Sequence, residues 1–568
     1  MSSFVQSRRY WIVAGVALLV VSAGMVQGSD LFSTSAGSVF DHDMNRMWSV
    51  FGTADGGVVP SQGNEAGWAE WNALKFAWSV EAGELEKLKK LLLTYPVSED
   101  GYVWSWKTEE GWPTHHFRHF DTNSKYILGV WRYTMWQGGK AFLETVDPKE
   151  FPNEYSAAVR DVSRGRTVLE KCRLAMGYQL KALLGAQGLL IIPSDTSDGT
   201  VAGKPTDYWD NFLFGNKSAT ANIYFYASLN AMRELEQAFG DPAKADEYSA
   251  LMAKVKHCFN DTFWDAEKGR YVGCVDVSGR VWDLGFTYLN LEAVTYGLAS
   301  RGQAEQIFKW LDGGRIIQSD IQTVAGKKTG VTGKDIYDLI WAPRSTTKAV
   351  EAVPVDGKYW WWNVGDQITV GGKRPSAAYG EHVENGGAIF YVSFYDLMAR
   401  LKVLGADNSF NRLSAIMGEF AKDKLQRDPK NNVGASWKWG LIGEFPESGL
   451  IPTFLIHGYL GLSATADGVV IQPDLPAKLM RLSLNQASWH GHPFSVAVER
   501  RDESHPPCHI TFQSLGKTAS AFRVVCKNLV PGHAYRIRVN GDESMQTAST
   551  EGVLNFELEP AMGIEIDE

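Results

Sequence analysis

The chain has 568 residues, of which 44% are hydrophobic and 21% are charged. This composition is that of a globular protein, and the length suits one large domain with a smaller one, so a mainly disordered chain is excluded. The formal net charge of -9 offers no basic surface to a phosphate backbone, which excludes nucleic acid as an expected partner.

The first 28 residues have the pattern of a secretory signal peptide. Arg8 and Arg9 precede an apolar run from Trp11 to Val26, which is short for a bilayer span. We expect cleavage near Gly28 and a secreted or periplasmic mature chain with no stable membrane span. An uncleaved membrane anchor is the alternative.

Apolar residues spaced three and four apart dominate from about residue 40 to 463, which predicts amphipathic helices. We expect roughly ten to twelve helices, several of them arranged as pairs. The apolar stripes cover residues 71–78, 85–92, 127–135, 169–183, 225–235, 248–259, 284–298, 304–311, 390–404 and 410–420.

Long connections rich in Gly and Trp separate these helices. Loops of such length in a compact domain are usually functional or disordered, and their aromatic content argues against disorder. We therefore predict that they form the walls of a site. They cover residues 52–67, 101–120, 194–215, 334–387 and 431–449.

The pattern changes after Gly461 to short β-branched segments divided by Gly, Pro, Asn and Asp, which predicts a β-sandwich of about 100 residues. The expected strands cover 468–471, 494–498, 509–512, 522–525 and 535–541. We place a signal peptide at 1–28, a helical catalytic domain at 29–464 and the sandwich at 465–568. Cys508 and Cys526 lie on neighbouring β-like segments, where a disulfide and two buried thiols both fit the sequence.

Three motifs resemble the six-hairpin toroid glycosidases, a superfamily that includes cellobiose phosphorylases, trehalases, glucoamylases and α-L-rhamnosidases. Asp207–Asn211, which reads Asp-Tyr-Trp-Asp-Asn, is similar to their proton-donor segment. Glu384–Gly387, which reads Glu-Asn-Gly-Gly, is similar to an element of the phosphorylases. Gly458–Leu462 followed by Asp467–Pro476 is similar to their passage from the last barrel helix into a β domain.

The resemblance implies a mainly α fold, an (α/α)6 toroid of helical hairpins with a C-terminal β-sandwich. It also implies a glycoside hydrolase that acts on an oligosaccharide or polysaccharide without a cofactor or metal. No large β domain precedes the helices and the phosphate-binding residues of the phosphorylases are not recognisable, so we expect hydrolysis rather than phosphorolysis. The oligomeric state, the sugar and the anomer are not indicated.

The superfamily is mainly inverting, which implies two carboxyl groups about 6.5 to 9.5 Å apart, one as acid and one as base. Asp210 is the first candidate acid, because Trp209 and Phe212 beside it disfavour the charged carboxylate. Asp207 is the second candidate. The alternative is that either residue caps the helix that starts near Ser218 or bonds to a loop.

Three glutamates are candidates for the base. Glu384 and Glu381 lie before a predicted helix, where the helix dipole favours the ionised form. An acidic first turn is also ordinary helix chemistry. Glu447 is the third candidate, because a late loop carries the base in several members of the superfamily.

The remaining candidates are residues that could bind the sugar. Aromatic side chains stack on sugar rings, and His, Asp, Asn and Arg bond hydroxyl or acidic groups. For the histidines, structural hydrogen bonding and a metal site are the alternatives. The candidates are Trp106, His116, His119, Asp121, Trp209, Arg344, Trp361, Trp362 and Asn385.

Two other functions stay open. A polysaccharide lyase that acts on a uronate-containing glycan would recruit a His or Tyr base, with His116, His119 and Asn123 available. A non-catalytic glycan-binding protein would bind sugars without cleaving them.

Overall fold

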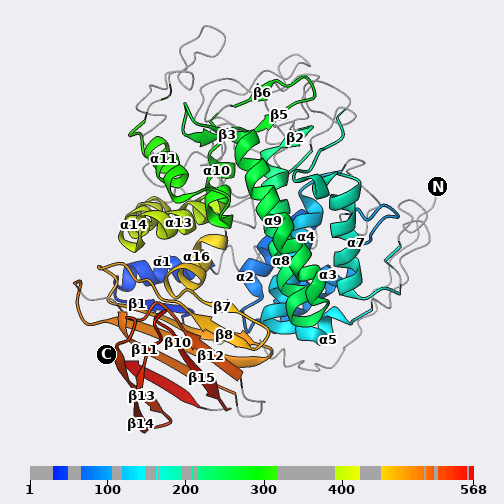
Figure 1. The fold of residues 1–568 in the computed structure, drawn as a ribbon. Coiled ribbons are helices and arrows are strands. Elements are labelled where there is room, and N and C mark those ends of the chain that lie inside the picture. Colours follow the sequence, from blue (N-terminus) through cyan, green and yellow to red (C-terminus); the bar gives the residue numbers. More distant parts are fainter. Residues whose placement is uncertain are drawn as a thin grey trace, which may run out of the picture.

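The computed structural model describes residues 30–48, 66–104, 118–146, 162–163, 165–194, 206–208, 215–283, 285–315, 317, 390–421, 449–504, 507–516, 522–559 and 562–568. Helices fill the first part of the chain, and a β-sandwich forms the last part (Figure 1). The predicted fold class is confirmed.

Six helices form a closed inner ring, in which each packs against the next and the last packs against the first. Several of them are buried almost all round, as α2 is along its whole length, which is typical of helices in the interior of a domain. In ring order they are α2 (Ala69–Phe76), α4 (Thr122–Tyr133), α8 (Ala219–Phe239), α10 (Thr287–Tyr296), α13 (Phe390–Leu404) and α16 (Leu450–Phe454).

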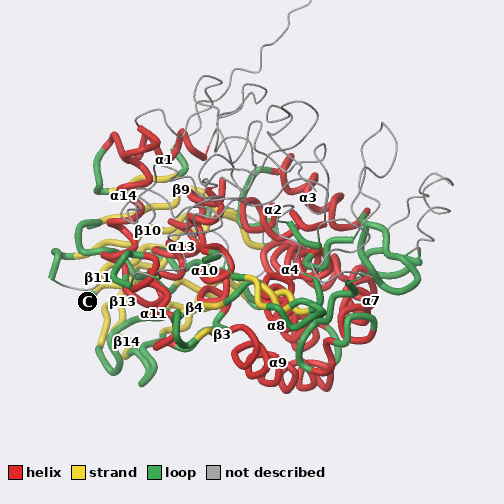
Figure 2. Tube along the Cα trace, turned by 90° about the horizontal axis from the view of Figure 1, so that it is seen from above, coloured by secondary structure: helices red, strands yellow, loops and turns green. Residues whose placement is uncertain are grey.

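Outer helices pack against this ring and complete the hairpins. They are amphipathic, and the buried stripe of α11, for example, consists of Ala304, Ile307, Phe308 and Leu311 with Trp310 beside it. In the order of their inner partners they are α3 (Ala82–Thr94), α7 (Val168–Lys181), α9 (Pro242–Phe263), α11 (Arg301–Leu311), α14 (Ala406–Ala421) and α1 (Ser38–Trp48), which packs against α16 and α14. Figure 2 shows the helices from above.

Local sequence fixes several helix ends. The Ser218 hydroxyl accepts a bond from the Ala221 N–H and caps α8. Asp241 caps α9, with Pro242 in the first turn. Gly405 has a φ of +86° directly after α13, a conformation that favours glycine. The apolar stripe predicted at 390–404 thus ends where α13 ends.

Six shorter elements complete the helical part. The helix α5 covers Gly139–Leu143, and the five small strands form one three-stranded and one two-stranded sheet next to α8, α9 and α10. These strands are β2 (Lys217–Ser218), β3 (Trp264–Asp265), β4 (Arg270–Tyr271), β5 (Cys274–Val275) and β6 (Val281–Trp282).

The sandwich consists of a seven-stranded and a four-stranded sheet. Inward side chains alternate with outward ones, as in Leu554–Leu558. The larger sheet has the order β1 (Phe32–Thr34), β9 (Arg481–Trp489), β10 (His492–Arg500), β11 (Pro507–Ser514), β16 (Gly563–Asp567), β13 (Ala534–Val539) and β14 (Asp542–Thr547). The smaller sheet has the order β15 (Leu554–Leu558), β12 (Phe522–Cys526), β8 (Gly468–Ile471) and β7 (Ser463–Ala464). In this sheet β8 and β12 run parallel, and the other two neighbouring pairs are antiparallel.

The sandwich is joined to the helical part through β1, which leads into α1, and through bonds near the ends of α2 and α4. Phe32 near the start of the described chain pairs with Leu484 of β9. The Ser488 N–H donates to the Trp78 carbonyl at 2.7 Å, and the His490 N–H donates to the Trp136 carbonyl at 2.6 Å. Both carbonyls lie just after the C-terminal ends of α2 and α4. The sandwich therefore covers that end of these two inner helices.

The structure bears on the two cysteine alternatives through Cys526. Cys526 is a free thiol on β12 in the smaller sheet, whereas Cys508 belongs to β11 in the larger one. The disulfide considered from the sequence does not form. Burial raises the pKa of the Cys526 thiol to about 12, so this thiol is chemically inert at neutral pH.

No helix among the described residues is long and apolar enough to cross a membrane. The predicted signal segment, residues 1–28, lies outside the described residues, so its cleavage and the location of the mature chain stay predictions.

Candidate active site

The predicted site residues share a place in the chain: each lies in the segment that leads into an inner helix. His119 and Asp121 precede α4, and Asp207 precedes α8. These segments enter at the N-terminal ends of the helices, opposite the ends of α2 and α4 that meet the sandwich. The helices α8 and α10 run parallel. Thr220 of α8 contacts Tyr288 of α10, and one turn later in both helices Tyr224 contacts Glu292.

The segments before α4 and α8 meet. The Phe120 N–H donates to the Thr206 carbonyl at 2.8 Å. Asp207 is fully buried, and Ser218 rather than Asp207 caps α8, so the capping role considered for Asp207 is wrong. The next residue, Tyr208, places its ring edge on Trp71 of α2, with 4.8 Å between ring centroids.

His119 is buried beside this junction. The Tyr102 hydroxyl donates to the His119 carbonyl at 3.2 Å and accepts from its N–H at 3.0 Å. Both bonds involve the backbone of His119, so they fix the path of the chain into α4. Contact of its imidazole with a sugar stays a prediction.

A buried ion pair lies one turn into α4. Lys125 Nζ is 2.7 Å from Asp121 Oδ2, and both side chains are 1% exposed. The ammonium also faces three rings, with centroids at 4.2 Å for Trp71, 4.5 Å for Tyr224 and 5.0 Å for Tyr208. Lys125 thus connects α2, α4, α8 and the segment that carries Asp207.

A carboxyl of α10 lies close to this ammonium. The Tyr224 hydroxyl donates to Glu292 Oε1 at 2.7 Å. Burial raises the pKa of the Glu292 carboxyl to about 8, although Lys125 and Tyr224 act in the opposite direction. Glu292 is therefore largely protonated at neutral pH and can donate a hydrogen bond as well as accept one.

A second buried carboxyl, Glu70 of α2, completes the cluster. It accepts a bond from the Tyr296 hydroxyl and lies 3.4 Å from Arg132. Tyr395 of α13 bonds Trp71 Nε1 at 3.3 Å and lies 3.1 Å from the Tyr296 hydroxyl. Burial raises the pKa of Glu70, and the nearby cations reduce this effect.

We name the side chains of Glu70, Asp121, Lys125, Tyr224 and Glu292 the axial cluster. Among the described residues, Glu70 Oε2 and Glu292 Oε2 are buried without a hydrogen-bond partner. Buried polar atoms without partners carry a free-energy cost, which a ligand hydroxyl or a bound water would remove. The cluster thus offers hydrogen-bonding groups next to aromatic rings, a combination that suits a sugar.

The sequence interpretation did not single out Glu70, Lys125 or Glu292. Each belongs to an apolar helix stripe or its flank, a pattern that predicts a helix and no site. The available signal was a charged residue within apolar neighbours, as in Leu291-Glu292-Ala293-Val294.

A pH test follows from Glu292. Burial raises the pKa of Glu292 from 4.5 to about 8, so the folded chain holds this proton more tightly than the unfolded chain does. The stability that Glu292 contributes is therefore fully present below pH 4.5 and is lost as the pH rises to about 8. We expect Glu292→Gln, which cannot ionise, to gain stability relative to the parent chain across this range, by roughly 4 kcal/mol at the upper end. Chemical denaturation at pH 5, 6.5 and 8 measures it. A difference in stability that does not change with pH would contradict the raised pKa.

The other predicted site residues lie outside the described residues and stay predictions. They are Trp106, His116, Trp209, Asp210, Arg344, Trp361, Trp362, Glu381, Glu384, Asn385 and Glu447. Among the residues with a described structure, no group of three or more His, Cys, Asp or Glu side chains could hold a metal ion.

Comparison with known structures identifies the architecture. An α-L-rhamnosidase from Dictyoglumus thermophilum is similar over 94% of this chain and 50% of its own, with a TM-score of 0.53 and 10% identity. A GH78 family rhamnosidase of Bacillus SP. GL1 is similar over 84% of this chain and 41% of its own, with a TM-score of 0.52 and 15% identity. The chain has the six-hairpin glycosidase fold. The fold implied by the motif resemblance is thereby confirmed.

Two further comparisons define the extent of this similarity. The family model for the bacterial alpha-L-rhamnosidase 6 hairpin glycosidase domain matches residues 201–282 of the chain. A structure described as a sialidase is similar over 92% of the chain and 41% of its own, with a TM-score of 0.50 and 12% identity. No curated protein matches the chain. The chain spans half or less of the length of these three solved structures.

Proposed function

We propose that the chain is a glycoside hydrolase that cleaves a glycosidic bond by inversion, with Asp210 as the acid. The observation that carries this proposal is the position of the segment before Asp210. Tyr208, two residues earlier, lies on Trp71 and over Lys125 at the entrance to the inner ring. The matched rhamnosidase domain region, 201–282, includes Asp207 and Asp210.

In this mechanism Asp210 protonates the leaving oxygen, and a second carboxylate activates water on the opposite face of the sugar. Trp209 and Phe212 flank Asp210 in the sequence and favour its protonated form. Glu384, Glu381 and Glu447 are the proposed alternatives for the base, each before an inner helix. Asp207 remains the second candidate for the acid.

The axial cluster would form the polar floor below the reacting sugar. Protonated Glu292 can donate to a sugar hydroxyl, and Glu70 can accept from one. The Trp71 and Tyr208 rings would supply apolar contact beside it. The cluster holds and orients the sugar, and it leaves the proton transfer to the carboxyl groups of the entering segments.

We also propose an α-L-rhamnoside as the first substrate to test, because the matched family model describes α-L-rhamnosidases. Secretion, through the N-terminal apolar segment, is part of the same proposal.

The test is incubation of the purified chain with a panel of aryl glycosides and oligosaccharides, with and without phosphate, while released reducing sugar is measured. We expect hydrolysis of at least one glycoside at a rate that does not depend on phosphate. A product that absorbs through a new double bond would support a lyase instead. Binding without cleavage of any member of the panel would support a non-catalytic glycan-binding protein.

A further inference from the structure

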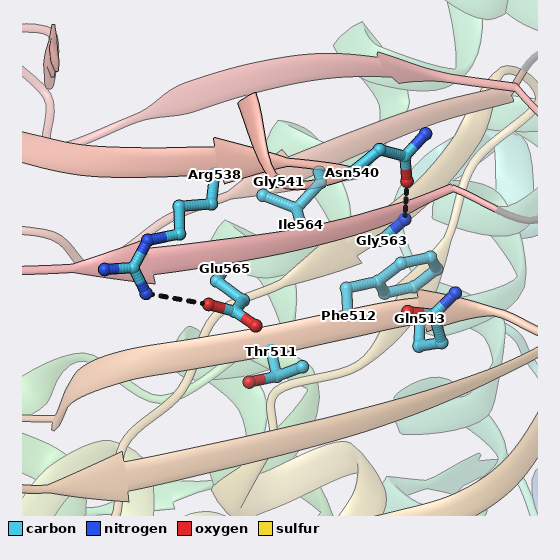
Figure 3. A pocket seen from close by; sticks show the side chains of 9 residues that line it. All are labelled: Thr511, Phe512, Gln513, Arg538, Asn540, Gly541, Gly563, Ile564 and Glu565. Atoms are coloured by element: carbon cyan, nitrogen blue, oxygen red, sulfur yellow. Dashed lines mark hydrogen bonds and ion pairs between the residues drawn. The ribbon is translucent and has the colours of Figure 1, made fainter. Parts of the chain in front are cut away.

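The outer face of the larger sheet has a hollow of about 120 Å³ (Figure 3). It is lined from three adjacent strands: β11, β16 and β13 with its following turn. A buried water needs about 10–15 Å³, so the hollow can accept several waters or one sugar ring.

Gly563 lines this hollow and leaves room for the Gln513 side chain beside it. It lies opposite Gln513 in the β11–β16 pairing, at a position where another residue would carry an outward side chain. A Cβ at Gly563 would come within 2.4 Å of the Gln513 amide oxygen. On its other side, the Gly563 N–H donates to the Asn540 side chain at 3.0 Å.

The next row across the same strands consists of Thr511, Glu565 and Arg538. Arg538 Nη1 lies 3.1 Å from Glu565 Oε2, and these side chains are 38% and 45% exposed. Amide, hydroxyl, guanidinium and carboxylate groups thus surround one hollow. Phe512 and Ile564 lie beneath it, both 1% exposed.

The charge of this face argues against an anionic ligand. Arg538 also contacts Glu543 at 3.3 Å and Asp567 at 3.7 Å, and Arg536 contacts Glu543 at 3.4 Å, so three carboxylates outnumber the two guanidinium groups on this face. A free phosphate or carboxylate would meet this negative field. Neutral hydroxyl groups can both donate to the carboxylates and amide oxygens and accept from the guanidinium and amide N–H groups.

We propose that this hollow is a non-catalytic binding site for one unit of a neutral glycan, which holds a polymeric substrate on the protein. The choice of a glycan rests on the proposed function. Binding itself requires no bond cleavage, so the two proposals fail separately.

The test is native electrophoresis of the full chain through gels that contain a neutral galactomannan, a xyloglucan or a rhamnose-branched polysaccharide. We expect at least one polysaccharide to retard the chain. Gly563→Val fills the hollow with a side chain suited to a strand, and Gln513→Ala removes an amide from its wall. We expect both variants to bind about tenfold more weakly, as measured from mobility against polysaccharide concentration.

Ser544→Val is the matched control, because Ser544 is exposed on β14 and does not line the hollow. Circular dichroism checks the folding of each variant, and Gln513→Ala keeps the test decisive if Gly563→Val does not fold. Hydrolysis of a small aryl glycoside should be the same in all variants. Lack of retardation of the parent chain, equal retardation of all variants, or retardation removed by inorganic phosphate would overturn the proposal.

Discussion

Asp210→Asn is expected to lower the rate of glycoside hydrolysis by about a thousandfold, because an amide cannot protonate the leaving oxygen. The substitution is nearly isosteric, so binding of the sugar should change little. Comparison of kcat and KM on an aryl glycoside and on an unactivated oligosaccharide measures the effect. The loss should be larger on the oligosaccharide, whose leaving group needs the proton more.

Asp207→Asn is the matched control for this experiment. Asp207 precedes Asp210 by three residues and is fully buried, so its replacement should affect folding more than the pH dependence of kcat. If Asp207→Asn abolished hydrolysis in a folded protein while Asp210→Asn remained active, Asp207 would be the acid. If both variants remained fully active, a two-carboxylate mechanism with either residue as acid would be wrong.

Lys125→Met is expected to reduce the free energy of unfolding by about 3–5 kcal/mol, because Asp121 would be left as a buried charge without its partner. The substitution also removes the cation between the Trp71, Tyr208 and Tyr224 rings. Since Tyr208 leads to Asp210, we expect kcat to fall in the fraction of the variant that stays folded. Urea denaturation and active-fraction kinetics measure these two effects.

Two variants control for this interpretation. Lys140→Met removes a 65% exposed lysine that pairs with Glu144 on the surface, and should cost less than about 1 kcal/mol. The double variant Lys125→Met with Asp121→Asn removes both charges and should recover part of the lost stability. An equal loss of unfolding free energy in Lys125→Met and Lys140→Met would show that the buried ion pair does not stabilise the packing of these segments.

Periodicity predicted the helices well where an apolar stripe was long. The stripes at 169–183, 225–235 and 390–404 correspond to α7, α8 and α13. The five-residue α16 was not predicted, because it is too short for a periodic pattern. Its place in the ring depends on tertiary packing against α2 and α13.

The strands of the sandwich were predicted where β-branched residues cluster, as in β8, β12 and β13. The exposed strand β14, Asp542–Thr547, is polar except for Met545 and gave no such signal. The pairing of Phe32 with Leu484 joins residues 452 positions apart, which local sequence patterns do not encode.

The candidate site was predictable only in part. The motif around Asp207 and the loops before the inner helices were recognisable, because Gly- and Trp-rich connections interrupt the helical periodicity. The axial cluster was not, since Lys125 and Glu292 become neighbours only when the ring of helices closes. The sequence shows that Lys125 and Glu292 are charged residues in or beside apolar stripes, but it does not show which side chains they contact.

The most direct test of the central claim is ¹H NMR of the sugar released from an α-L-rhamnoside, or from whichever glycoside of the panel is cleaved, recorded during the first minutes of hydrolysis. An inverting two-carboxylate enzyme is predicted to release first the anomer opposite to that of the substrate, before mutarotation. Initial release of the same anomer, or no release from any glycoside, would contradict it.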